Sequence, residues 1–450
     1  MATIRSTSIR SSRIWHAPAS ALILWTCLWC NLNTGFWFFG MQDSLTGWLN
    51  FIRAALPFVV LPVSAAILLR RQKLHLPGNA PSRLLMVYGV FATIATVFSP
   101  IPMWSLYWSV AFLATIPAAW TFVDRSNPLE SSRQLLQITW VATFIVAAII
   151  GYQARGDIFG QSATAYNVLV SLSGQARSSG VARWAAVPGL VCLIRAYNTR
   201  RRSLIAFYLF FAAISFFIVY RMQSRGAIFG SVAAVVFALL VSSRMRRYAL
   251  PFAAVAIVVI LYLDPSGLVS NRVSTYLERG QSTEEFLSMT GRTHAYEHGI
   301  AAFQDAPFFG RGQWADRLTI GEHVHNSFLQ ALLNGGIFGG IPYFASWVTG
   351  WMLFYKLYQR NARLKPEDRT HVLECGTVMM FFTVRAIPET TTASYSVDML
   401  VMVAVYVYFE SMSLQMKAKK LQPAIQRNYL APPWMSKPAT PVRIGTSRQI

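Results

Sequence analysis

The chain has 450 residues, of which 54% are hydrophobic and only 13% are charged. This composition is too apolar for an ordinary soluble protein. A net charge of +22 would indicate nucleic-acid binding in a soluble chain. Here the basic residues lie mainly in turns between apolar segments, so we expect contact with membrane lipid headgroups and no nucleic-acid partner.

Apolar segments long enough to cross a bilayer recur along the chain. We predict about twelve transmembrane helices, at 21–39, 48–69, 84–98, 103–123, 135–152, 181–194, 204–220, 227–242, 248–263, 337–355, 372–387 and 395–409. The predicted fold is an all-α polytopic membrane protein, with one integral membrane domain over 1–421. Residues 422–450 are basic and contain several prolines, which predicts a flexible cytoplasmic tail.

The basic residues also predict the orientation in the membrane. Every second turn is rich in lysine or arginine, and all seven lysines fall on that side. The positive-inside rule then places both termini in the cytoplasm, and the longest loop (264–336, between spans 9 and 10) outside it. The outer side still carries arginines, which hold phosphate or carboxylate oxygens well. Salt bridges to loop acids are the alternative explanation for about half of these arginines.

Arginines and glycines gather in three short motifs on the predicted outer side. Arg221 and Arg225 are four residues apart, so they would share a face if helical, or else be two solvated interfacial arginines. Arg292 is a candidate phosphate ligand, with a salt bridge to Glu297 as the alternative. Gly310 and Gly312 offer either a backbone nest for an anion or only a tight turn, and spacing alone favours the turn.

A polar segment follows the third motif. Residues 325–327 predict the N-terminus of a helix over 328–333, which the run 334–336 interrupts before the next span. Such a helix can present its positive end to an anion. His323 and His325 form an HxH pair, but no other ligands complete a metal motif, so we expect no metal and no cofactor. A histidine titrates near neutral pH and suits general-base work on a hydroxyl, with capping or packing as the alternative.

Arginines together with a histidine indicate a particular reaction. The arginines would stabilise a phosphate-rich leaving group while the histidine accepts a proton from an acceptor hydroxyl. A glycan on a lipid diphosphate is a suitable donor at the outer membrane face. Cys27 and Cys30 form a CxxC inside an apolar segment, which we interpret as packing because partners for a metal or redox site are missing.

The ordered motifs resemble those of the O-antigen ligase and polysaccharide polymerase family of bacterial membrane glycosyltransferases. The matching residues are Ser224-Arg225-Gly226, Thr290-Gly291-Arg292, Pro307 to Gly312, and His325 to Gln330 followed by Gly335-Gly336. The resemblance covers roughly 180–340. It departs from many relatives after Arg177-Ser178-Ser179-Gly180, where Val181-Ala182-Arg183-Trp184 replaces an Asn-Pro-Asn-like segment, so the roles of Arg177 and Arg183 stay open.

The resemblance implies a fold similar to that of other polytopic glycosyltransferases (GT-C-like), in the bacterial inner membrane. It implies an undecaprenyl-diphosphate-linked oligosaccharide donor and metal-independent inverting transfer. Arg225 and Arg292 would bind the diphosphate, and His325 would be the base or bind the acceptor. The expected substrate-binding residues are Arg221, Arg177, Arg183, Gly310, Gly312, Asn326 and His323.

The acceptor stays open at this stage. We favour a polymerase of exopolysaccharide or O-antigen repeat units, whose further partner would be a chain-length regulator. The alternative is a ligase that transfers glycan to lipid A-core. A flippase or secondary transporter is less favoured, because the chain shows no internal repeat and its long loop lies outside the cytoplasm.

Overall fold

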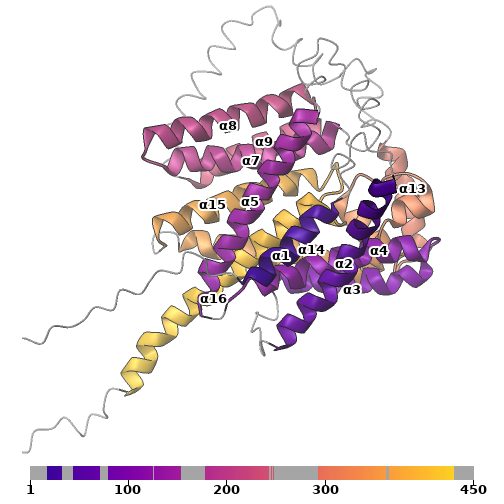
Figure 1. Cartoon of the computed structure of the whole chain (residues 1–450), viewed down its shortest axis with the longest axis horizontal. Helices are drawn as coiled ribbons and strands as arrows, with labels where there is room; N and C mark the ends of the chain where they lie inside the picture. Colours follow the sequence, from indigo (N-terminus) through magenta and orange to yellow (C-terminus); the bar gives the residue numbers. More distant parts are fainter. Residues whose placement is uncertain are drawn as a thin grey trace, which may run out of the picture.

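The computed structural model describes residues 18–32, 44–70, 80–124, 126–153, 178–242, 245, 247, 292–360 and 364–429. The main helices are α1 (Ala19–Asn31), α2 (Ser44–Arg70), α3 (Pro81–Ile94), α4 (Pro102–Thr121), α5 (Pro128–Gln153), α7 (Ser178–Asn198), α8 (Arg202–Arg221), α9 (Arg225–Val241), α13 (Arg292–Gln304), α14 (Ser327–Gln359), α15 (Pro366–Arg385) and α16 (Val397–Tyr429). Two short turns, η2 (Ala95–Phe98) and η3 (Asp316–Ile320), complete the set (Figure 1). These described segments contain no strand, which confirms the all-α class.

Each predicted span other than 248–263 overlaps one of these helices, and 248–263 lies outside the described residues. Six described helices are long and apolar enough to cross a membrane, in α2, α3 with η2, α5, α8, α14 and α16. The chain is therefore a multi-pass membrane protein, while the number of twelve spans stays a prediction. Helix α16 continues to Tyr429, past the predicted start of the tail at 422.

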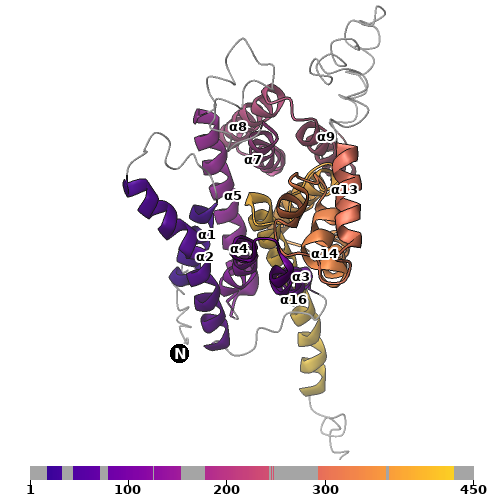
Figure 2. The same cartoon turned by 90° about the vertical axis from the view of Figure 1, so that its right-hand side faces the viewer.

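The helices form two groups around a central layer (Figures 1 and 2). On one side α7 packs along α8 and against α9, and on the other α2 and α3 pack against α4. Between them, α14 runs along α3, α15 along α9, and α16 against α5 and α4. The outward faces of α2 and α8 expose large apolar side chains such as Phe51, Phe207 and Phe210, which a bilayer would cover.

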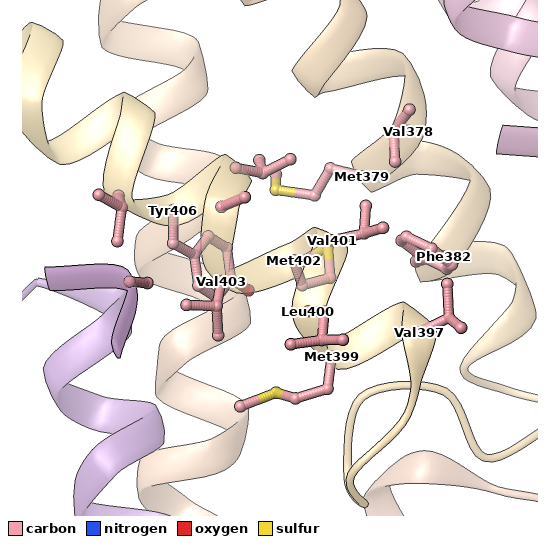
Figure 3. Close-up of a cluster of buried hydrophobic side chains, with 14 of the residues drawn as sticks. Val378, Met379, Phe382, Val397, Met399, Leu400, Val401, Met402, Val403 and Tyr406 are labelled. Carbon is pink, nitrogen blue, oxygen red and sulfur yellow. The ribbon is translucent and has the colours of Figure 1, made fainter. Parts of the chain in front are cut away.

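Helix α16 is the centre of the core. Every side chain from Val397 to Met412 is buried, and most of these side chains are apolar, as expected for a helix inside a core. Figure 3 shows its first turns packed against Val378, Met379 and Phe382 of α15. The loop 386–396 joins these two buried helices, so its position is fixed from both ends.

Helix α14 is broken at Gly336, whose φ of 58° and ψ of −160° are not helical. This confirms the predicted interruption at 334–336. The kink releases the carbonyls of Leu333 and Asn334, which accept hydrogen bonds from Arg311 N (2.9 Å) and Gly312 N (2.9 Å). The turn at 306–312 is therefore docked into the kink. A side chain at 336 would collide with the carbonyl of Phe308, so only glycine fits there.

Candidate active site

Glu389, in the loop between α15 and α16, lies at the centre of the polar site. Its Oε1 is 2.9 Å from Arg292 Nη2, at the first residue of α13. Its Oε2 is 3.3 Å from Nδ1 of His325, just before α14. Burial alone would raise the pKa of Glu389, but the hydrogen bond from His325 and the positive charge of Arg385 lower it well below its usual value. Glu389 is therefore a carboxylate that links two predicted site residues.

Ser327 fastens this loop to the start of α14. Its backbone N–H donates to the carbonyl of Ala386 (2.9 Å), and its hydroxyl donates to the carbonyl of Glu389 (3.1 Å). The same hydroxyl oxygen accepts a hydrogen bond from the N–H of Thr391 (2.8 Å). One serine thus holds both sides of Glu389 against the helix that follows His325.

Asn326 is the N-cap of α14, which confirms the predicted helix start. Its Oδ1 accepts hydrogen bonds from the N–H groups of Phe328 and Leu329, each at 2.9 Å. Its Nδ2 donates to the carbonyl of Ile387 (3.1 Å). The first N–H groups of α14 are therefore already bonded within the protein, and Asn326 caps the helix.

His325 adopts a left-handed backbone conformation, with φ of 47°. Few non-glycine residues do so, and such strain is often stored at functional sites. The ionised Glu389 only accepts hydrogen bonds, so the Nδ1–H of His325 must donate to it. This arrangement leaves Nε2 of His325 to accept a proton.

Arg385, the last residue of α15, adds a second cation behind Glu389. Its side chain is fully buried, and its three nitrogens have no hydrogen-bond partner within the described part of the chain. A glycine on α9 makes room for it, since a Cβ at Gly230 would lie 3.2 Å from Arg385 Cγ. Buried guanidinium groups are normally paired, so Arg385 has donors available for an anion.

A further ion pair borders the cluster. Arg183 on α7 lies with its Nη1 3.1 Å from Oδ2 of the buried Asp398 on α16, and its guanidinium is 5.3 Å from the ring centre of Trp184. Three arginines (183, 292 and 385) thus face two carboxylates (389 and 398), which leaves one positive charge in excess. This excess favours an anionic ligand.

Arg225 begins α9 beside the same cluster. A Cβ on the next residue, Gly226, would lie 3.7 Å from Glu389 Cγ, so this helix end faces the loop 386–396. Arg221 is the last residue of α8. A short turn joins α8 to α9, and in this turn Gln223 has a positive φ of 47°. Arg221 and Arg225 are therefore on different helices and do not share one helical face. Arg177, another predicted site residue, lies outside the described residues.

His323 belongs to a separate buried network. Its Nδ1 donates to Asp316 Oδ2 (2.6 Å), and Gln330 Nε2 donates to Asp316 Oδ1 (3.1 Å). Burial opposes ionisation of Asp316, but the hydrogen bond and charge of His323 lower the pKa of Asp316 below its usual value. The rings of His323 and His325 are 4.5 Å apart, so this network supports the position of His325.

Gly310 and Gly312 support the fold of the site. Gly310 N donates to Ala306 O (3.1 Å), and Gly312 N donates into the kink of α14 as described above. Both have positive φ, of 72° and 82°. These amides are used within the protein, which supports the turn that spacing alone favoured.

Two groups have the composition of a metal site. One is His323, His325 and Glu389, and the other is His294, His298 and Glu322. In the first group the short contact to Asp316 already occupies Nδ1 of His323. In the same group Nδ1 of His325 lies 3.3 Å from Glu389 Oε2, so each of the two imidazoles is held by a carboxylate.

Sequence reasoning missed Arg385, Glu389 and Asp398 as site residues. Arg385 lies within the predicted span 372–387. An ionisable residue inside an apolar span is itself a signal of function, and the acid four residues later, Glu389, strengthens it. The predicted alternative, a salt bridge from Arg292 to Glu297, is not formed. Arg292 pairs with Glu389, and Glu297 is exposed.

Residues 209–344 match the family model described as O-Antigen ligase. The matched segment includes Arg221, Arg225, Arg292 and His325, while Glu389 lies beyond it. A comparison with curated proteins gave no match.

Proposed function

We propose that this chain, whose residues 209–344 match the O-antigen ligase family model, is a glycosyltransferase that uses a glycan on undecaprenyl diphosphate. The reaction takes place at the periplasmic face of the bacterial inner membrane, with both termini in the cytoplasm. The preferred acceptor is another glycan, so that the chain polymerises repeat units of an exopolysaccharide or O-antigen.

The excess of positive charge around Glu389 is the observation that supports this proposal most. Arg385 is buried with unused donors, and Arg292 and Arg183 each use guanidinium nitrogens on one carboxylate. A diphosphate supplies both the charge and the oxygens that such a cluster lacks. Its negative charge grows as the glycosyl bond breaks, so these cations stabilise the transition state more than the ground state.

The proton is handled by His325 and Glu389. The acceptor hydroxyl oxygen attacks the anomeric carbon, and its proton passes to Nε2 of His325. The bond from that carbon to the diphosphate oxygen breaks, and undecaprenyl diphosphate leaves with the electron pair. Glu389 holds the Nδ1–H and stabilises the imidazolium that forms. A single displacement of this kind inverts the anomeric centre, and the chain's own cations neutralise the leaving group.

A ligase that transfers the glycan to lipid A-core is the second candidate, because the family description names that activity. Both activities need the same donor and the same base, and they differ only in the acceptor. A chain-length regulator as a partner would accompany the polymerase.

The test uses a strain lacking the protein and measures glycan product relative to the amount of protein in the membrane. Arg292→Ala should lower transfer about a hundred- to a thousandfold, as loss of one charge-stabilising donor does. Arg292→Lys should restore only part of it, because an ammonium cannot hold two oxygens as a guanidinium does. His325→Ala should lose transfer but keep binding of the lipid-linked donor.

Arg202→Ala is the matched control, since this exposed arginine lies at the far end of α8. It should transfer at the wild-type rate. Full activity in Arg292→Ala would refute the proposed donor site. Product in the form of a ladder of repeat lengths identifies the polymerase, and transfer of preformed chains to lipid A-core identifies the ligase.

A further inference from the structure

Two histidines on α13 and one glutamate near the end of the following loop converge away from the Glu389 site. His294 and His298 are four residues apart, so they lie on the same face of α13, with ring centres 3.9 Å apart. Glu322 reaches them from the segment that links η3 to α14. Its Oε1 is 3.5 Å from Nδ1 of His294 and 3.3 Å from Nδ1 of His298.

The distances fit ligands of one ion better than hydrogen bonds. A tetrahedral zinc ion binds nitrogen and oxygen at about 2.0–2.2 Å, which sets neighbouring ligand atoms roughly 3.3–3.5 Å apart. Glu322 Oε1 is buried and has no hydrogen-bond partner among the described residues, although two imidazoles lie beside it. In contrast, His323 and Asp316 are 2.6 Å apart, which is the spacing of a strong hydrogen bond and too short for two ligands of one ion.

We propose that His294, His298 and Glu322 form a binding site for one divalent transition-metal ion of the zinc class. Two imidazoles and a carboxylate suit Zn²⁺ and similar ions better than Mg²⁺ or Ca²⁺, which prefer oxygen ligands. The three ligand atoms lie within 4.8 Å of one another. The histidine side chains are 65% and 47% exposed, so water completes the coordination.

The ion ties α13 to the segment that carries His325. Glu322 is three residues before His325, and Arg292 begins α13. The ion therefore connects the two elements that carry the ion-pair partners of Glu389. The ion stabilises this arrangement and takes no part in glycosyl transfer. This inference does not depend on the proposed activity, because binding is measured without any glycan.

The test titrates the purified full-length chain with Co²⁺ and then Zn²⁺. The protein is kept in detergent, carries no histidine tag and is first stripped with a chelator. We expect one Co²⁺ per chain, detected by its visible ligand-field absorption, displacement of that absorption by Zn²⁺, and a rise in the thermal midpoint. Binding should weaken as the pH falls, because protons compete with the metal ion for the imidazole nitrogens.

The double variant His294→Ala/His298→Ala should lose the Co²⁺ absorption and the metal-dependent rise in thermal midpoint. Glu322→Gln is a second, milder variant, which should weaken binding while it keeps the shape of the side chain. Cys30→Ser and His325→Ala are the controls and should bind as the wild type does. An unchanged absorption in the double variant, or a loss of binding in His325→Ala alone, would overturn this site.

Discussion

Replacing Glu389 with glutamine is the most informative perturbation of the site. The change keeps the size of the side chain but removes the negative charge between Arg292 and His325. It leaves three arginines beside one carboxylate, Asp398, where the native cluster has two carboxylates. The substitution therefore tests the electrostatic argument without creating a cavity.

The expected effects follow from burial. Removing one partner of a buried ion pair costs about 3–5 kcal/mol, and we expect the lower end because Arg292 and His325 are about a quarter exposed. For catalysis, loss of the acid that orients a histidine lowers the rate by about ten-thousandfold in the best-studied triad. The oxygen of a glutamine amide can still accept from Nδ1 of His325, so the loss here should be between about a hundredfold and that value.

The assay measures the thermal midpoint in detergent and the transfer rate for four proteins: wild type, Glu389→Gln, Arg292→Ala and the double variant. The two residues touch, so their effects should be coupled by about 0.5–3 kcal/mol. Glu297→Gln is the control on the exposed face of α13 and should be unchanged in both measurements. Additive effects of the two single changes, or a loss in Glu297→Gln that equals that of Glu389→Gln, would refute the assigned pairing.

The other predictions concern topology, the kink, acidity and metal. A reporter that is active only outside the cytoplasm should work when fused at Ser282 and fail at Asn198, and the reverse result would invert the proposed orientation. Gly336→Ala should destabilise the protein by about 1–3 kcal/mol, because the positive φ and the Phe308 carbonyl both oppose a side chain, and an unchanged thermal midpoint would contradict this. The pKa of Glu389 is lowered on folding, so the carboxylate stabilises the fold at pH values above its unfolded pKa of about 4.3, and this stabilisation is lost as the pH falls toward the folded pKa. The thermal midpoint of the wild type should therefore drop more on acidification than the thermal midpoint of Glu389→Gln. Transfer should persist in a strong chelator at temperatures where the metal-free protein stays folded, because the ion proposed at His294, His298 and Glu322 is structural. A loss of transfer under these conditions that one divalent ion restores would contradict the arginine and histidine mechanism.

The helical framework could be predicted from the sequence because each apolar segment carries its own signal. The start of α14 at Asn326 and its interruption near Gly336 followed from residue types alone. The partners of the site residues could not be predicted in this way. Arg292 has Glu297 five residues later on its own helix, yet it pairs with Glu389, 97 residues later. That choice is made by the docking of the loop 386–396 onto Ser327, and such docking depends on tertiary packing.

The role of the glycines at 310–312 could not be predicted from the sequence either. Glycines at a turn can bind an anion or dock against a helix, and the local sequence is compatible with both. Here the broken helix α14 has two carbonyls to satisfy, and the turn satisfies them. The outcome was decided by unpaired backbone groups on a different element.

The central position of α16 has a consequence for biogenesis. This helix is the last one synthesised among the described elements, yet it supplies the middle of the core and the carboxylate that pairs with Arg183. Until the ribosome has completed residues 397–412, the earlier helices surround a space that only α16 fills, and Arg183 lacks Asp398. The bundle can therefore close only after α16 has been synthesised. A chain truncated before Val397 would leave an open assembly with an uncompensated arginine, which membrane quality-control proteases could recognise.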